Sequence, residues 1–130
     1  MKKFLTNWGP VLGYASLIFV ASSFRTQVRP GLDKVVHAFE YAVMGFFTTR
    51  AVLLSWDLPK LWGLVSGASF ALLLGILDEF HQYFVPGRNA SVFDAMADAV
   101  GAVLGALLFI SLGNLLYQSE KLYPRHDKCC

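Results

Sequence analysis

Charge is scarce in this sequence. Charged residues make up 15% of the chain, whereas a soluble domain has about 25%. Apolar residues make up 55%. A soluble helix normally keeps one polar face, yet the stretch at residues 61–77 has none. The scarcity of charge therefore argues against a soluble all-helical protein and favours a membrane protein.

Several signatures of known chemistry are also missing. The chain has two cysteines, Cys129 and Cys130, which are adjacent. Two adjacent thiols cannot build a disulfide framework, and alone they cannot complete a metal site. The sequence contains no P-loop, dinucleotide-binding glycine motif or serine nucleophile elbow. Its basic residues form no patterned patch, so we expect no nucleic-acid partner.

Long apolar segments fill most of the chain. A membrane-spanning helix needs about 20 mostly apolar residues, within a range of roughly 17–25. Four segments meet this requirement, at about residues 8–24, 34–54, 61–77 and 92–117. The connections between them are short, so consecutive helices should be antiparallel neighbours. We predict an all-α integral membrane bundle of four transmembrane helices with up-and-down topology, forming one domain over residues 1–130.

The first segment has an alternative interpretation as a signal peptide. Residues 1–3 (MKK) precede an apolar run that ends in small residues at 20–23 (VASS). The run is long for that role, however. Gly9 and Gly13 also have a spacing that lets helices approach closely. We therefore predict a retained span whose glycines face a neighbouring helix.

Turn and capping residues mark the ends of the segments. Residues 57–60 (DLPK) form a short turn on one side, and residues 86–89 (PGRN) form a turn on the other. Asp33 is predicted to cap the second helix, and Ser91 the last helix.

The distribution of lysine and arginine predicts the orientation, because cytoplasmic loops are enriched in these residues. One side of the predicted bundle carries seven of them: Lys2, Lys3, Arg50, Lys60, Lys121, Arg125 and Lys128. The other side carries four: Arg25, Arg29, Lys34 and Arg88. We predict a multi-pass membrane protein with both termini in the cytoplasm.

Polar residues enter the apolar segments almost entirely at the outer end of the predicted bundle. They are Lys34, His37, Glu40, Asp78, Glu79, Gln82, Asp94 and Asp98. Such residues are costly in hydrocarbon, so their convergence predicts a site. Helical spacing places Asp94 and Asp98 on one stripe with Gly101 and Gly105. Small residues permit tight helix packing, so we expect this stripe to face the interior of the bundle.

Two stretches resemble the VanZ-like family. Residues 33–41 (DKVVHAFEY), followed by Gly45, resemble the family pattern DKxxHxxxYxxLG, with Met44 where leucine is common. Residues 78–88 (DEFHQYFVPGR), followed by Asp94 and Asp98, resemble the pattern DExxQxFxPxR and its downstream acids. Asp98 stands where asparagine is frequent. The resemblance implies a multi-pass protein of the bacterial cytoplasmic (inner) membrane that belongs to the cell envelope. The family's name comes from a protein associated with low-level resistance to the glycopeptide teicoplanin.

The motif positions supply the candidate site residues. The candidate catalytic residues are His37, Asp78, Glu79, Asp94 and Asp98. The candidate substrate-binding residues are Lys34, Tyr41, Gln82 and Arg88. In an enzyme, His37 or a carboxylate would act as the general base, and Lys34 and Arg88 would contact an anion.

Acidic residues outnumber basic ones at the predicted outer end. The acids are Asp33, Glu40, Asp78, Glu79, Asp94 and Asp98, and four bases oppose them, which leaves a balance of 4 − 6 = −2. The surplus predicts protonated carboxyl groups, internal ion pairs or a bound divalent cation. Candidate metal ligands are Asp94, Asp98 and Glu79, which suit Mg²⁺, Ca²⁺ or Mn²⁺; His37 or His81 would also admit Zn²⁺.

Three classes of function remain open. The first is an enzyme or binder acting on an amphipathic envelope substrate, either a lipid-linked phosphate or a glycan precursor. The second is a non-enzymatic binder or translocator coupled to protonation of Asp98 or Glu40. The third is a membrane scaffold that acts through partners and whose polar cluster is structural. Whether the chain forms a homo-oligomer stays open. In the structural interpretation Lys34 reaches the headgroups, His37 hydrogen-bonds Tyr41, and Asp94 and Asp98 are counter-ions of Arg88 and Lys34.

Overall fold

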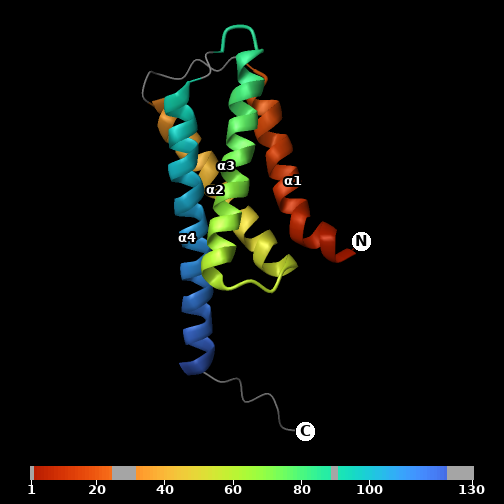
Figure 1. Ribbon diagram of the computed structural model, residues 1–130, viewed down its shortest axis with the longest axis vertical. Coiled ribbons are helices and arrows are strands. Elements are labelled where there is room, and N and C mark those ends of the chain that lie inside the picture. The colour runs from red at the N-terminus through yellow and green to blue at the C-terminus, as the bar shows by residue number, and fades with distance from the viewer. Residues whose placement is uncertain (1, 25–31, 89–90, 123–130) are drawn as a thin grey trace.

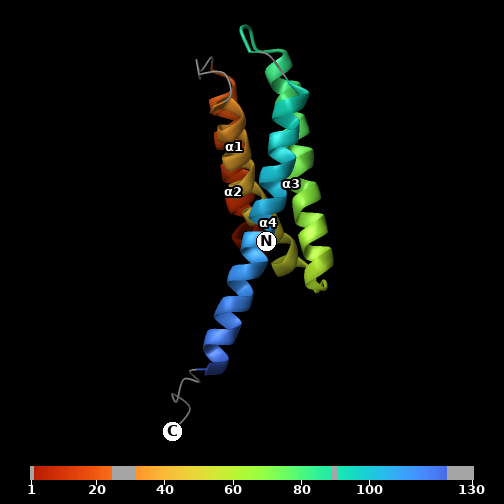
Figure 2. The ribbon, with the colours of Figure 1, turned by 90° about the vertical axis from the view of Figure 1, so that its left-hand side faces the viewer.

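The fold is an up-and-down bundle of α-helices. The computed structural model describes residues 2–24, 32–88 and 91–122, with side chains described as far as residue 114. This part of the chain contains four helices: α1 (Lys2–Ser22), α2 (Leu32–Ser55), α3 (Lys60–Tyr83) and α4 (Val92–Leu122). Consecutive helices run in opposite directions, and the end of α4 extends beyond the others (Figures 1 and 2).

The helices are longer than the apolar segments that predict them. The first begins at Lys2 rather than near residue 8, and α3 continues beyond residue 77 to Tyr83. Asp78, Glu79 and Gln82 therefore lie in the last turns of α3, as their spacing predicted. The end of a helix is set by its backbone hydrogen bonds, so it need not coincide with the end of the apolar run.

Of the two predicted helix caps, the structure confirms Ser91 but not Asp33. Asp33 lies inside the first turn of α2, so its prediction as the cap is wrong, although an acid there favours the helix dipole. Ser91 does cap α4, because its Oγ accepts a hydrogen bond from the Phe93 backbone N–H at 3.2 Å. In the turn before α4, Gly87 has a φ of 85°, a conformation that suits glycine.

Within the described residues, three helices are long and apolar enough to cross a membrane: α1, α3 and the Val92–Asn114 part of α4. Large apolar side chains on these helices point outward, and Leu17, Leu73 and Leu104 are each more than half exposed. Such a surface suits contact with lipid. The remaining helix, α2, is interrupted by charged residues and is not among the three.

The closest helix packing is between α2 and α4. A Cβ at Gly101 would overlap the Ala38 backbone carbonyl, and a Cβ at Gly105 would overlap that of Ala42. Glycine therefore lets the two backbones touch. Asp98 shares this stripe and is completely buried. The predicted inward stripe is confirmed.

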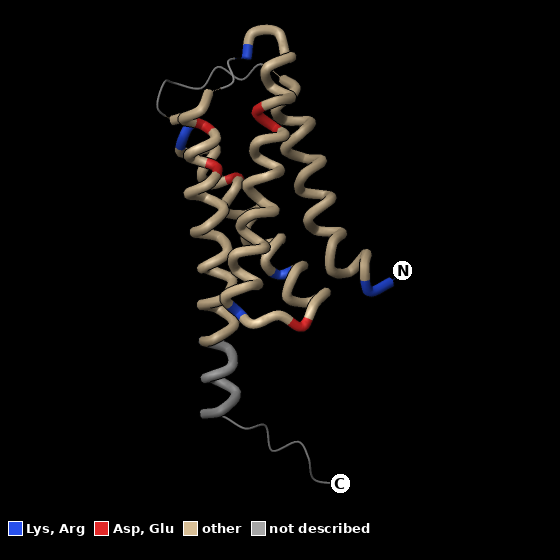
Figure 3. Tube along the Cα trace, in the orientation of Figure 1, with Lys and Arg blue, Asp and Glu red and all other residues tan. Residues whose placement is uncertain are grey.

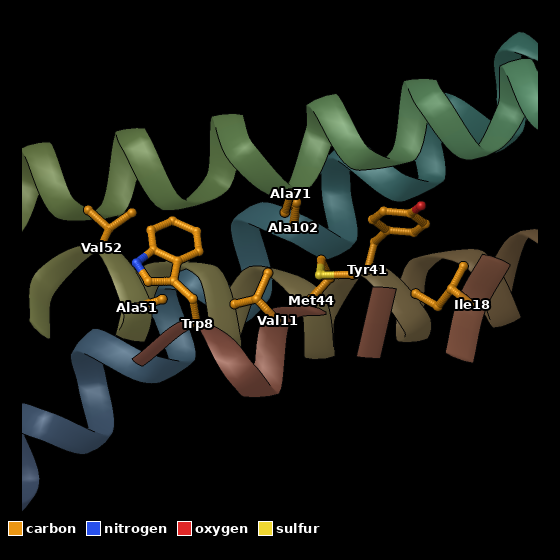
Figure 4. Packing of buried hydrophobic residues seen from close by; sticks show 9 residues of the cluster. All are labelled: Trp8, Val11, Ile18, Tyr41, Met44, Ala51, Val52, Ala71 and Ala102. Carbon is orange, nitrogen blue, oxygen red and sulfur yellow. The ribbon is translucent and has the colours of Figure 1, made fainter. Parts of the chain in front are cut away.

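The helix α1 packs differently from the prediction. No atom of a neighbouring helix lies within 4 Å of a Cβ built at Gly9 or Gly13, so the predicted close approach there is wrong. Large side chains make the contact instead. Trp8 packs beside Ala51 and Val52 in Figure 4, and its indole N–H donates to Ser55 Oγ at 3.0 Å.

Candidate functional site

The predicted polar residues come together at one end of the bundle. In Figure 3 the acidic segments of α2, α3 and α4 lie near the same end of the bundle. Asp57 belongs to the loop between α2 and α3, which is at the opposite end. The buried members of this polar cluster are His37, Asp78, Glu79, Gln82, Asp94 and Asp98. Burial of so many titratable groups is costly unless they are matched by partners, and the partners fall into three groups.

The first group joins α2, α3 and α4 around His37. The His37 Nδ1 atom lies 3.0 Å from Asp98 Oδ1 and 3.8 Å from Glu79 Oε1. The other carboxylate oxygen of Glu79, Oε2, accepts a hydrogen bond from the Ser91 backbone N–H at 3.0 Å. A Cβ at Gly75 would lie 3.1 Å from Asp98 Oδ2, so the missing side chain leaves room for the carboxylate.

The second group ties α1 to the end of α3. Ser22 Oγ donates to Asp78 Oδ1 at 2.7 Å, and Gln82 Nε2 donates to Asp78 Oδ2 at 2.6 Å. Arg88 Nη2 in turn donates to Gln82 Oε1 at 2.6 Å. Asp78 and Gln82 lie one helical turn apart, which is why both can face the same partners. No site role was predicted for Ser22, although it lies among the small residues that end the first apolar run.

The third group is the ion pair between Lys34 and Asp94. Lys34 Nζ lies 3.1 Å from Asp94 Oδ1 and 3.4 Å from Asp33 Oδ2. The counter-ion interpretation therefore fits Asp94 with Lys34. It does not fit Asp98, whose carboxylate contacts His37 instead.

The metal-ligand prediction needs a correction. Within the described part of the chain, the side chains that could bind one ion together are His37, Glu79 and Asp98, whose ligand atoms all lie within 4.8 Å of one another. Asp94 is not a member of this set. Its carboxylate is turned to Lys34, which the sequence spacing alone could not show.

Two other candidates lie apart from this set. His81 faces α1, where its Nε2 lies 3.0 Å from Ser23 Oγ and its ring centroid lies 4.1 Å from that of Phe19. It therefore offers no ligand to the cluster. Tyr41 is 1% exposed and lines an apolar cavity rather than the polar one.

Two adjoining cavities open beside these groups. The first is a polar cavity of about 160 Å³, lined by Ser22, His37, Glu40, Asp78, Gln82 and Arg88 among others. The second is an apolar crevice of about 500 Å³ between α1, α2 and α3, lined by residues that include Leu12, Phe19, Tyr41 and Leu77. Ile18 and Asp78 line both. Arg25 and Arg29 lie outside the described residues.

Comparison with known proteins identifies a family for this chain. The model of the family described as VanZ/LLP1 matches residues 3–116. No curated protein and no solved structure matches the chain.

Proposed function

Because this chain belongs to the VanZ/LLP1 family and carries helices that can cross a membrane, we propose that it is an inner-membrane protein of the bacterial cell envelope. Its polar cluster faces outward and binds an amphipathic substrate, a lipid-linked phosphate or glycan precursor. Modification of that substrate at the same site, and an effect on teicoplanin susceptibility, are part of the proposal.

The proposed topology has α2 as the fourth span. This helix has 24 residues, which corresponds to about 36 Å of helix and is enough to cross the hydrocarbon core. Its early charged residues belong to the polar cluster, and Arg50 lies near its other end. Lys2, Lys3 and Lys60 lie at that same end of the bundle as Arg50. Basic residues favour the cytoplasmic side, which supports an outward-facing cluster.

The observation that carries the proposal is that the two cavities share Ile18 and Asp78 in their walls. The apolar crevice is lined by Leu12, Phe19 and Leu77, each more than half exposed on the outer surface of the bundle. A hydrocarbon chain can therefore enter sideways from the bilayer. Asp78 lines both the crevice and the polar cavity, and Arg88 lines the polar cavity. An amphipathic molecule would place its chain in the crevice and its anionic headgroup beside Arg88.

The size of the polar cavity limits the headgroup. A cavity of about 160 Å³ suits a phosphate or a small part of a larger headgroup. It is much smaller than the cavities of about 300–1,000 Å³ that hold drug-sized ligands. A glycan attached to the phosphate would therefore extend past the turn at Gly87 into the aqueous phase.

Native mass spectrometry of the purified chain in detergent tests this proposal. The protein is titrated with a polyprenyl phosphate and, separately, with the uncharged polyprenol. We expect tighter binding of the phosphate, and Arg88→Gln should remove that preference. Ala15→Phe should weaken both ligands because Ala15 lines the crevice. The control Leu104→Phe adds a ring at an exposed position of α4 outside the crevice and should change nothing.

Two results would contradict the proposal. One is equal binding of the phosphate and the alcohol by the unaltered chain. The other is equal loss of binding in the Ala15 and Leu104 variants, since general disturbance of the bundle would then explain the effect.

A further inference from the structure

A second feature of the polar cluster is a pair of buried carboxylate oxygens without hydrogen-bond partners. Glu79 Oε1 and Asp98 Oδ2 are both in this position in the described structure. Their residues are only 8% and 0% exposed. Buried polar atoms are nearly always partnered in native proteins, so each exception needs an explanation.

We propose that His37, Glu79 and Asp98 form a binding site for a divalent transition-metal ion, with Zn²⁺ or Mn²⁺ as the fitting ions. The three side chains come from α2, α3 and α4 and offer one nitrogen and two carboxylate oxygens. This mixed set suits Zn²⁺ and Mn²⁺ better than Mg²⁺ or Ca²⁺, which prefer oxygen ligands throughout. The site does not depend on the identity of the lipid.

The distances fit such an ion. Metal–ligand bonds of about 2.0–2.2 Å place neighbouring ligand atoms roughly 3–3.5 Å apart. His37 Nδ1 lies 3.0 Å from Asp98 Oδ1 and 3.8 Å from Glu79 Oε1. The ligand atoms of the three residues all lie within 4.8 Å of one another, and an ion between them would give Glu79 Oε1 the partner that it lacks.

The charges fit as well. Two carboxylates and a neutral imidazole carry a charge of −2, which a divalent cation cancels. The competing arrangement is a protonated imidazole that bridges the two acids. Its single Nδ1 proton can bond Asp98, but Glu79 Oε1, at 3.8 Å, is beyond hydrogen-bonding distance. A metal ion satisfies both acids, whereas the imidazolium satisfies one.

One side of the proposed site borders a cavity. His37, alone among the three ligands, lines the polar cavity of about 160 Å³, so an ion or water would reach the cluster past this side chain. Three protein ligands with open positions are typical of catalytic rather than structural metal sites. A water molecule or a phosphate oxygen in the cavity could take an open position, so the inference extends to metal-assisted chemistry on an anionic headgroup.

Metal analysis of the purified full chain tests the inference. The protein is prepared in detergent without a histidine tag, and Cys129 and Cys130 are replaced by serine to remove thiol ligands. It is stripped with a chelator, dialysed against Zn²⁺ or Mn²⁺ and analysed for bound metal. We expect one ion per chain and a higher melting temperature with metal than without it.

Substitutions in the cluster identify the ligands. Glu79→Gln and Asp98→Asn should each lose the bound ion and the metal-dependent rise in melting temperature. Asp94→Asn should keep both, because Asp94 faces Lys34, and Asp57→Asn is a matched control in the loop at the opposite end. If Asp98→Asn does not fold, Glu79→Gln decides the test, since a glutamine oxygen can still accept from the Ser91 N–H.

Several outcomes would overturn the inference. One is that the unaltered chain binds no stoichiometric ion, which would favour the imidazolium arrangement. Another is that Glu79→Gln retains the ion. A third is that Asp94→Asn loses it. The lipid titration under the proposed function measures a different ligand. Loss of the metal site therefore would not contradict lipid binding, and absence of lipid binding would not contradict the metal site.

Discussion

The contact between α2 and α4 makes a strong prediction, because backbone atoms form it. A Cβ at Gly101 would overlap the carbonyl oxygen, carbon and Cα of Ala38. Backbone atoms cannot rotate away as a flexible side chain can. Ordinary carbon contacts are about 3.5–4.0 Å, so Gly101→Ala must push the two helices apart by roughly 1 Å. Overpacking of this kind costs about 1–3 kcal/mol, which is roughly a 5- to 150-fold loss in the unfolding equilibrium constant.

Gly13→Ala is the matched control for this change. It makes the same substitution inside α1, where no atom of a neighbouring helix lies within 4 Å of the new Cβ. Alanine is the better helix former by about 1 kcal/mol, so Gly13→Ala should be neutral or slightly stabilising. Unfolding by denaturing detergent, followed by tryptophan fluorescence, measures both variants. Equal stability of Gly101→Ala and Gly13→Ala would refute the close packing of α2 on α4.

Two further predictions concern the membrane. The first uses single-cysteine variants in which Cys129 and Cys130 are replaced by serine. A thiol reagent that cannot cross the membrane should label Phe84→Cys from outside the cell and should not reach Asp57→Cys. Labelling of Asp57→Cys from outside would show that the orientation is the reverse. In cells, expression of the chain should raise the teicoplanin concentration needed to stop growth, and Arg88→Gln should remove the effect at equal protein level. If expression of the unaltered chain leaves the inhibitory concentration of teicoplanin unchanged, the proposed effect on glycopeptide susceptibility is wrong.

The sequence predicts the helical bundle well because apolar length and helical spacing are local properties. The stripe that contains Asp98, Gly101 and Gly105 is one example. Its small residues permit a close neighbour, and its acid would be expensive against lipid, so both arguments give the same inward direction. The same reasoning fails at Gly9 and Gly13, because their spacing permits a close approach but does not show which helix lies opposite.

Side-chain partners in the cluster depend on how the helices are placed relative to one another. Asp94 and Asp98 are one turn apart on α4, and the sequence offers Lys34, His37 and Arg88 as partners for either. The packing of α2 on α4 selects Lys34 for Asp94 and His37 for Asp98. No spacing within one helix contains that information. The crevice has the same origin, since it lies between three helices that are separate in sequence.

The most direct test of the proposed lipid site is cross-linking with a polyprenyl phosphate that carries a photoactivatable group in its hydrocarbon chain. The protein is irradiated in lipid nanodiscs, and the labelled residues are identified by peptide mass spectrometry. The proposal predicts labels concentrated at Leu12, Phe19 and Leu77 around the crevice. It also predicts that an excess of unlabelled polyprenyl phosphate competes them away. Labels spread equally over the exposed residues of α4, such as Leu104 and Leu108, would contradict it.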